Sequence, residues 1–164
     1  MERIIDIYGY KTYFDQPYEL EDTWFGRVVL KENQTFEGIV EDYYQTSKSM
    51  VFGTIGESSI ELTQCTKGDD EVPYFYDAKE EDGRFYGDYF AKNPYVVIPL
   101  GECKLSVFPS EKTREYSETE LKELKKEIIR FKHNLGEVGE TLYQRFELAR
   151  VEEKPKEKVN KQVR

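Results

Sequence analysis

The sequence has little cysteine, little histidine and no long apolar run, and each shortage argues against a class of protein. Cys65, Cys103 and His133 are its only thiol and imidazole side chains, too few for a zinc site with the ordinary number of such ligands. No apolar run reaches the roughly 18 residues of a membrane-spanning helix. The N-terminal residues MERIIDIYGY lack the basic and apolar regions of a secretory signal. We therefore expect two free thiols, a cytoplasmic protein and no membrane partner.

Positive charge is also scarce in most of the chain. The 164 residues carry a formal net charge of −9, and residues 1–109 hold 10 Lys and Arg against 21 Asp and Glu. Proteins bind phosphate backbones through clustered cations, so this acidic body argues against a nucleic-acid partner. Aromatic residues, in contrast, make up 15% of the chain. This aromatic content favours a folded protein built mainly from strands.

Four segments repeat one frame, in which apolar residues stand two positions before and two positions after a glycine. These segments are residues 24–28, 36–40, 51–55 and 85–89. Side chains alternate along a strand, so each glycine shares a face with its apolar neighbours. Glycine marks tight bends in barrels, where the concave face has no room for a side chain. We predict that all four glycines lie on the concave face of curved strands.

The rest of residues 1–109 fits further strands joined by short polar turns. Asp82-Gly83 stands between two aromatic runs and is a strong hairpin signal. The segment YVVIPLGECKLSVF is interpreted as one strand or as two strands broken near Pro99. About eight consecutive strands with short turns predict a mainly β domain, an antiparallel up-and-down barrel.

After Pro109 the apolar period becomes helical. Ser117 followed by Glu120 predicts a capping box at a helix start. Apolar residues then recur at spacings of three and four, the amphipathic pattern of a helix. They are Leu121, Leu124, Ile128, Phe131, Leu135, Val138 and Leu142.

Two glycines interrupt this helical pattern. Gly136 and Gly139 each weaken a helix by roughly 1 kcal/mol relative to Ala. We expect one bent helix or two helices, split near residues 134–136, within residues 117–151. Residues 152–164 are charged and nearly without apolar side chains, and we expect a disordered tail there.

The apolar stripe of the helix needs a surface that covers it. It can dock on the outside of the barrel, where Phe25, Ile39, Phe52 and Tyr86 would offer contacts, or it can pair with another chain. Docking within one chain costs no association entropy, so we favour it. For the alternative, a homodimer or another partner would bind through Leu124, Ile128, Phe131 and Leu135. The protein is accordingly expected to be a monomer or a homodimer formed through the helix.

No stretch carries a recognisable catalytic, metal or cofactor site. The acidic stretch DAKEEDGRFYGD has the length of a calcium loop but places Lys79 and Asp82 where a ligand and the turn glycine belong. The glycines of GTIGESS lack the spacing and context of a dinucleotide fingerprint. We assign no catalytic residue, no metal ligand and no cofactor, and an enzyme is the third alternative because fold does not settle function.

Residues 3–109 resemble a calycin-type barrel, the group of the lipocalins, the fatty-acid-binding proteins and the avidins. The resemblance rests on the aromatic-x-Gly frames, on Trp24 in an early strand and on the EDGRFYGDY hairpin. It implies an up-and-down barrel that binds a small apolar ligand in its interior.

Two classes of function follow as expectations. In the first, the chain is a cytoplasmic binding protein for a small, largely apolar ligand. The candidate ligand-lining residues are Trp24, Phe36, Val40, Phe85 and Tyr89. In the second, the barrel is filled and serves as a structural or interaction module, and the helix mediates partner binding or dimerisation. An eight-stranded barrel has room for side chains or for one small ligand, so the sequence leaves both open.

Overall fold

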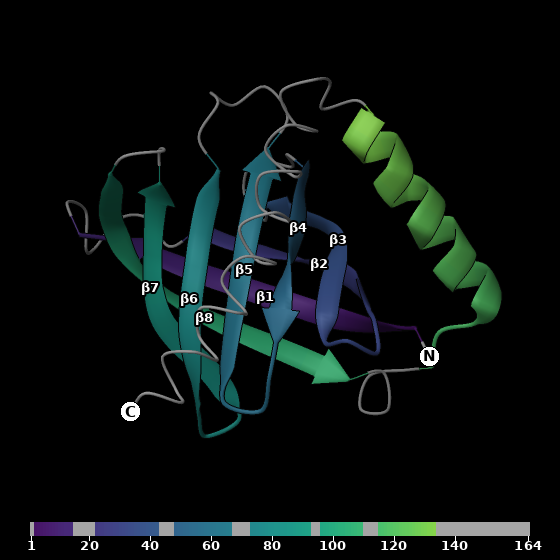
Figure 1. Ribbon diagram of the computed structural model, residues 1–164, viewed down its shortest axis with the longest axis horizontal. Helices are drawn as coiled ribbons and strands as arrows, with labels where there is room; N and C mark the ends of the chain where they lie inside the picture. The colour runs from purple at the N-terminus through teal and green to yellow at the C-terminus, as the bar shows by residue number, and fades with distance from the viewer. Residues whose placement is uncertain are drawn as a thin grey trace, which may run out of the picture.

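The computed structural model describes residues 2–14, 22–42, 48–66, 73–92, 96–109 and 115–133. Eight strands run through the first five of these ranges: β1 (Arg3–Tyr13), β2 (Asp22–Leu30), β3 (Thr35–Asp42), β4 (Lys48–Ile55), β5 (Ser59–Thr66), β6 (Tyr74–Glu81), β7 (Arg84–Lys92) and β8 (Val97–Pro109). Each strand pairs antiparallel with the next one, and β8 pairs with β1 to close the barrel (Figure 1). The predicted antiparallel up-and-down barrel is confirmed.

The strand β8 passes through Pro99 without ending there. Its register against β7 shifts between Tyr89 and Phe90, so that Phe90 lies opposite Pro99. Proline has no N–H to donate to the ladder, and a local irregularity accommodates it. Of the two interpretations of this segment, one strand with an irregularity is therefore correct.

The two ends of the barrel differ in their connections. At one end, here called the turn end, residues 31–34, 56–58 and 82–83 join successive strands. Asp82 and Gly83 have positive φ angles of 53° and 81°, as a two-residue hairpin turn with right-handed strand twist requires. At the opposite end, here called the loop end, the connections fall on residues outside the described ranges.

The four frame glycines face the inside of the barrel, as predicted. Their partners in the frame, among them Trp24, Val28 and Val40, belong to the interior cluster. A Cβ on Gly38 would overlap the carbonyl oxygen of Arg27 and lie 2.5 Å from the Cα of Val28. The neighbouring backbone occupies the space of the missing side chain, which permits the tight curl of the strands.

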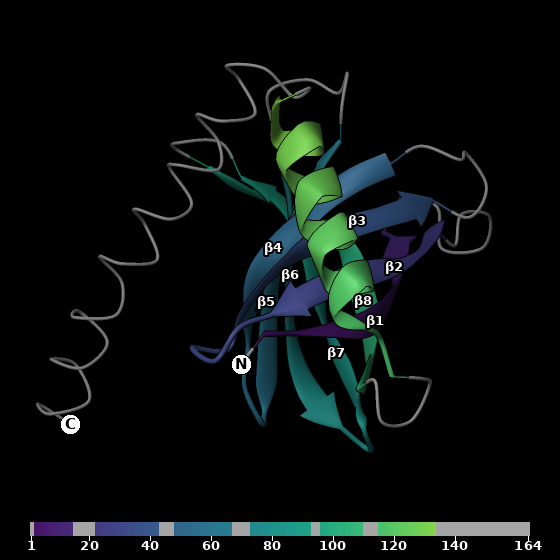
Figure 2. The ribbon, with the colours of Figure 1, turned by 90° about the vertical axis from the view of Figure 1, so that its right-hand side faces the viewer.

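The helix spans residues 118–133 and begins at the predicted capping box. The Ser117 hydroxyl accepts a hydrogen bond of 3.2 Å from the Glu120 N–H. The helix crosses the outer face of the barrel over β1 to β4 (Figure 2). Beneath it lies a second apolar cluster, made of Ile4, Val29, Ile39, Met50, Phe52, Cys65, Leu124 and Ile128. In this single chain the described part of the stripe, residues 121–131, packs on the barrel as the favoured alternative predicts.

The docking surface differs in part from the expected one. Ile39 and Phe52 contribute to it, but Phe25 and Tyr86 are exposed. The helix covers β1 to β4, and Tyr86 lies on β7, on another part of the barrel wall. Phe25 lies one row of side chains beyond Arg27, toward the loop end.

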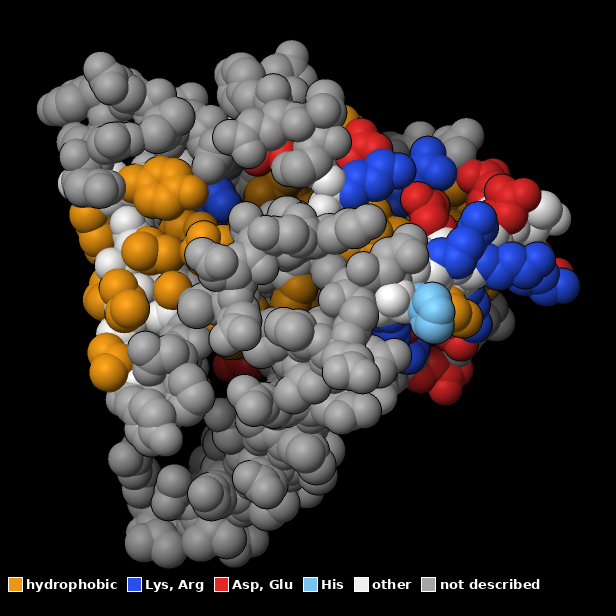
Figure 3. All heavy atoms as spheres, turned by 90° about the horizontal axis from the view of Figure 1, so that it is seen from above, with side chains coloured by type: hydrophobic (Ala, Val, Ile, Leu, Met, Phe, Trp, Pro, Cys, Tyr) orange, Lys and Arg blue, Asp and Glu red, His pale blue; other side chains and the backbone are white. Residues whose placement is uncertain are grey.

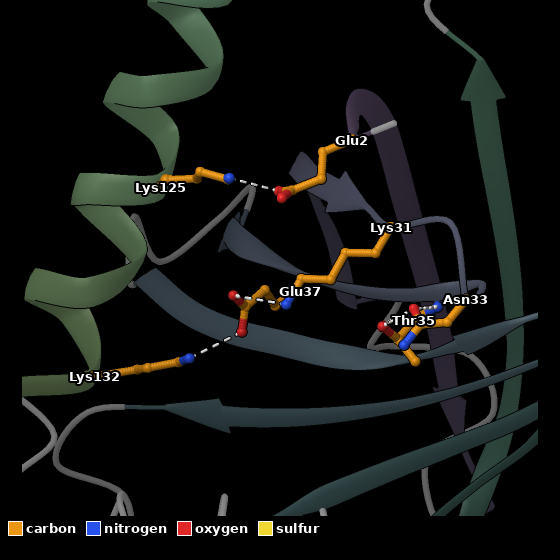
Figure 4. Close-up of polar contacts among 7 residues, drawn as sticks. All are labelled: Glu2, Lys31, Asn33, Thr35, Glu37, Lys125 and Lys132. Carbon is orange, nitrogen blue, oxygen red and sulfur yellow. Dashed lines mark hydrogen bonds and ion pairs between the residues drawn. The ribbon is translucent and has the colours of Figure 1, made fainter.

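Ion pairs fix the position of the helix on the barrel (Figure 4). The Nζ of Lys125 lies 2.7 Å from Oε2 of Glu2, and the Nζ of Lys132 lies 2.9 Å from Oε2 of Glu37. Partly exposed pairs of this kind add little stability, about 0–1 kcal/mol each, so the apolar cluster supplies most of the docking energy.

Several expectations fall on residues outside the described ranges. These are the positions of Leu135, Val138 and Leu142, the split near residues 134–136, the remainder of the segment 117–151 and the tail at 152–164. No helix among the described residues is long and apolar enough to cross a membrane.

The two cysteines are free and buried, which confirms the expected unbridged state. Cys103 lies inside the barrel, and Cys65 lies under the helix on the outer face. The barrel wall separates them, so they cannot form a disulfide without rearrangement of the sheet.

Candidate functional site

All five candidate ligand-lining residues lie in the barrel interior and belong to one buried cluster. They occupy two levels: Trp24, Val40 and Tyr89 lie toward the loop end, and Phe36 and Phe85 lie toward the turn end. Trp24 is 1% exposed and Phe85 is 7% exposed. These side chains are therefore packed against their neighbours in the interior cluster.

The interior is apolar toward the turn end and polar toward the loop end. The apolar end is made of Ile5, Leu30, Phe36, Ile60, Phe85 and Leu105. The polar end holds Lys11, Ser49, Gln64 and the tyrosines Tyr13, Tyr74, Tyr76 and Tyr89. Since the polar groups gather at one level, any chemistry of the interior belongs to the loop end.

A chain of hydrogen bonds crosses the interior at this level. The Trp24 indole N–H donates to the Tyr76 hydroxyl over 3.1 Å, and this hydroxyl donates to Oε1 of Gln64 over 2.7 Å. Nε2 of Gln64 donates to Oγ of Ser49 over 3.1 Å. The four residues come from β2, β6, β5 and β4, so the chain fixes side chains across half of the barrel. Such satisfied networks hold buried polar groups in single orientations.

Lys11 brings a positive charge into the barrel beside this network. Its side chain projects inward from β1 and is buried, with the residue 7% exposed. Its Nζ donates to the Tyr89 hydroxyl over 3.2 Å. The same nitrogen lies 4.7 Å, 5.3 Å and 5.9 Å from the ring centres of Tyr89, Tyr74 and Tyr13, within the range of cation–π attraction. We call these four residues the Lys11 cluster.

The protonation state of Tyr89 suits this arrangement. Burial, and then the neighbouring Tyr76 and Tyr13 side chains, raise the pKa of Tyr89 well above its ordinary value. The hydroxyl therefore keeps its proton and accepts the hydrogen bond from Nζ of Lys11.

The sequence carries a signal for Lys11 in the alternation along β1, although no motif contains this residue. Ile5, Ile7 and Gly9 alternate on the inner face of β1, and the same period places Lys11 and Tyr13 inward. Only the pairing of strands, however, brings Tyr74 and Tyr89 to Lys11, because they lie on β6 and β7.

A second candidate site is a groove on the outside, between the helix and the strands β1, β2 and β3. It has a volume of about 410 Å³. Its apolar lining includes Tyr8, Phe25, Ile39 and Leu124, and its charged lining includes Arg27. We call it the helix groove.

Three of the four candidate partner-binding residues are described, and they face the barrel from the helix. Leu124 and Ile128 are buried against the barrel and Phe131 is half-buried, whereas Leu135 is outside the described residues. Leu124 and Ile128 are therefore covered by the barrel in this single chain.

Exposed apolar residues also gather where β1 ends and β8 begins. They are Phe14, Val96, Val97 and Ile98. Seen from above, hydrophobic side chains lie on this side of the molecule and charged side chains lie on the side of the helix (Figure 3).

Neither reactive thiols nor metal-ligand clusters occur in the part of the chain that the structure describes. Burial raises the pKa of Cys65 to about 11, and burial with the nearby Asp88 and Asp77 raises that of Cys103 to about 12. Both are therefore poor nucleophiles at neutral pH. No three described His, Cys, Asp or Glu side chains come together as metal ligands.

Comparison of the chain with protein-family models, with curated proteins and with solved structures finds no match. The chain forms a closed eight-stranded up-and-down barrel with a helix docked on its outer face.

Proposed function

We propose that this chain is a calycin-like binding protein that holds a small, largely apolar ligand at the loop end of its barrel. The observation that carries the proposal is the Lys11 cluster. A lysine surrounded by tyrosine rings inside a barrel can recognise an acidic ligand, because hydrogen bonds between an ammonium and a carboxylate are charge-assisted. We therefore infer a ligand with an apolar body and one acidic group.

The burial of the cluster members supports a site at the end of the barrel rather than at its centre. Tyr13 and Tyr74 are half-buried, while Trp24 and Tyr76, one level deeper, are 1% exposed. A ligand would then contact Tyr13, Tyr74 and Lys11 above a packed floor. A small number of placed polar groups within aromatic surroundings is typical of small-molecule sites.

The cytoplasmic location is part of the same proposal. Both cysteines are free, and free thiols suit a reducing compartment. Fractionation of the cells that make the protein would test this location.

The ligand proposal is tested with Trp24 as the fluorescent reporter, since it is the only tryptophan and bonds to the network beside Lys11. The full-length protein is titrated with a medium-chain fatty acid and with the alcohol of the same length. The Lys11→Met variant should bind the acid about tenfold more weakly, a loss of about 1.4 kcal/mol, and the alcohol unchanged. Lys79→Met, at an exposed position on β6, is the matched control.

Two results would count against this function. If neither compound changes the Trp24 emission, and native mass spectrometry of the purified protein shows no bound small molecule, then ligand binding is refuted. If acid and alcohol bind equally to the wild type and to Lys11→Met, ligand binding stands but the role of Lys11 does not.

A second candidate function is that of an interaction module, and the helix groove is the observation that favours it. Leu124 and Ile128 are buried against the barrel, so partner binding or dimerisation would use the surface beside the helix. Native mass spectrometry of the full chain would report whether a monomer or a homodimer forms.

A further inference from the structure

The outer face of β6, β7 and β8 carries two neighbouring rows of polar side chains, and β6 and β7 lie on the side of the barrel away from the helix (Figure 1). The acidic row joins residues that are cross-strand partners: Asp77, Asp88 and Glu102. The lysine row, two residues away along each strand, joins the cross-strand partners Lys79, Tyr86 and Lys104. Both rows point outward, because residues beside them in the strands, such as Tyr76 and Leu105, belong to the interior cluster. We call this surface the two-row face.

Among the described residues, no cation forms an ion pair with the acidic row. Its three side chains are exposed. Like charges that stand directly opposite on neighbouring strands destabilise a sheet. The field of the row also reaches the interior, where burial and then the nearby Asp88 and Asp77 raise the pKa of Cys103 to about 12. A positive charge supplied from outside the chain would therefore be favourable at this row.

The lysine row is also accessible. Lys79 is exposed and Tyr86 is 41% exposed. Nζ of Lys104 lies 5.7 Å from the ring centre of Tyr86, so a cation–π contact holds this lysine at the surface. In the part of the chain that the structure describes, neither lysine forms an ion pair. Both rows therefore present their charges to a partner.

A second copy of the chain has a surface that matches both rows at once. Consider a two-fold axis that runs across the strands, midway between the two rows. Rotation about this axis exchanges the positions of the rows and places each strand opposite its own copy. Asp77 then faces the second copy's Lys79, and Glu102 faces the second copy's Lys104. Each contact occurs twice, as in every interface with two-fold symmetry.

We propose that two copies of this chain associate through the two-row face, with the acidic row of each copy on the lysine row of the other. A partner of a single charge would attract one row and repel the other, whereas a second copy attracts both. The inference is an alternative to dimerisation beside the helix and is independent of ligand binding in the barrel.

Apolar side chains adjoin the two-row face toward the loop end. The rings of Phe75 and Phe90 stack on the outer face of β6 and β7, with centres 5.6 Å apart and an angle of 16° between the planes. They add apolar surface at the edge of the contact. The wall is convex, so the contact is confined to a few strands, and small interfaces of this kind form weak, reversible dimers. We therefore expect a dimer that dissociates on dilution and at high salt, because salt screens exposed charges.

Sedimentation velocity of the full-length protein, over a range of concentrations at low and high salt, measures the association. One variant makes the face wholly basic, with Asp77→Lys and Asp88→Lys. A second variant makes it wholly acidic, with Lys79→Glu and Lys104→Glu. Each variant alone should associate at least about tenfold more weakly than the wild type. Mixed in equal amounts, the two should form a dimer of one copy each, because each supplies the charges that the other has lost.

Two control variants separate this interface from a general effect of charge and from the surface beside the helix. Glu115→Lys with Glu123→Lys, at exposed positions, makes the same change in net charge as the basic variant and should dimerise as the wild type does. Phe25→Ser, in the helix groove, should also leave the dimer unchanged. Thermal melting verifies that each variant is folded. Asp77→Asn with Asp88→Asn is a milder variant, which should weaken the dimer while it removes repulsion within the sheet.

Several results would overturn the inference. They are a wild type that stays monomeric at every concentration, a folded basic variant or asparagine variant that dimerises as the wild type does, and a mixture of the basic and acidic variants that does not associate. Loss of the dimer in a folded Phe25→Ser variant, with the two-row variants unchanged, would move the interface to the helix groove.

Discussion

At the scale of single residues, backbone atoms rather than side chains decide where glycine is required. The Cβ that Gly26, Gly38, Gly53 or Gly87 lacks would meet a carbonyl oxygen of the neighbouring strand. A flexible side chain could move away from such a Cβ, but a paired backbone cannot move without a loss of ladder hydrogen bonds. The frame glycines are therefore needed so that neighbouring strands can approach one another closely.

Gly38→Ala should consequently destabilise the protein, whereas Gly56→Ala should not. Forced overpacking costs about 1–3 kcal/mol, and the Cβ at Gly38 meets backbone. At Gly56 the nearest atom, the carbonyl oxygen of Ser59, is 3.8 Å away, which is ordinary contact. Urea unfolding followed by Trp24 fluorescence compares the two. Equal midpoints for both variants would contradict the explanation of the frame.

The thiols give a prediction for alkaline pH. Both pKa values are raised above the ordinary 9.0, to about 11 for Cys65 and about 12 for Cys103, with burial as the main cause. Above pH 9.0 the unfolded chain therefore loses thiol protons that the folded chain keeps. The free energy of unfolding should be independent of these groups below pH 9.0 and fall as the pH rises toward 11 and 12.

A thiol reagent tests the same burial at neutral pH. Both cysteines should remain unmodified in the native protein and react fully in urea, because the reagent needs an accessible thiolate. Modification at the same rate with and without urea would show that the two side chains are not buried.

At the scale of elements, the helix depends on the barrel more than on its own sequence. A helix of this length is marginal in water, and its stability comes from the packing of its apolar face. Ile128 is 1% exposed against the outer face of the barrel, while its neighbour Ile129 is 64% exposed. Both residues are isoleucines of the same helix, so a comparison of the two separates the effect of packing from the effect of helix propensity.

Ile128→Ala should cost about 2–5 kcal/mol of unfolding free energy, and Ile129→Ala about 0.5 kcal/mol or less. The reason is that only Ile128 leaves a cavity in the cluster beneath the helix. Chemical unfolding of both variants provides the measurement. Similar values for the two would mean that the helix is not docked in solution as it is in the structure.

At the scale of the whole molecule, the barrel wall has an apolar cluster on each side. The interior cluster is enclosed by closure of the sheet, and the outer cluster is enclosed only by the helix. Because the barrel is closed, it has no free strand edge that needs protection. Among the described elements, only the helix separates the outer apolar cluster from water.

A chain that ends at Pro109 should therefore expose Ile4, Val29, Ile39, Met50 and Phe52 and aggregate. A chain that ends at His133 keeps the described helix and serves as the control. Light scattering after size exclusion reports the mass of each, and a hydrophobic dye reports exposed apolar surface. A soluble, dye-negative barrel from the shorter chain would refute the dependence on the helix.

The sequence by itself determined the local features of the fold. Alternation predicted which face of each frame strand is inside, Asp82-Gly83 predicted a tight hairpin, and Ser117 with Glu120 predicted the helix start. Each of these features depends on residues within a few positions of one another. Their conformations follow from side-chain period, positive φ and end capping, which need no knowledge of the rest of the chain.

Only the tertiary structure decided the two candidate sites. Lys11 meets Tyr74 and Tyr89 because strands distant in sequence close into one barrel with a particular register. Arg27 lies over Tyr116 because the segment before the helix returns to β2. A shift of one residue in any strand would turn its side chains to the other face of the wall. The sites therefore depend on register and closure, which arise from contacts along the whole chain and cannot be read from any one segment of it.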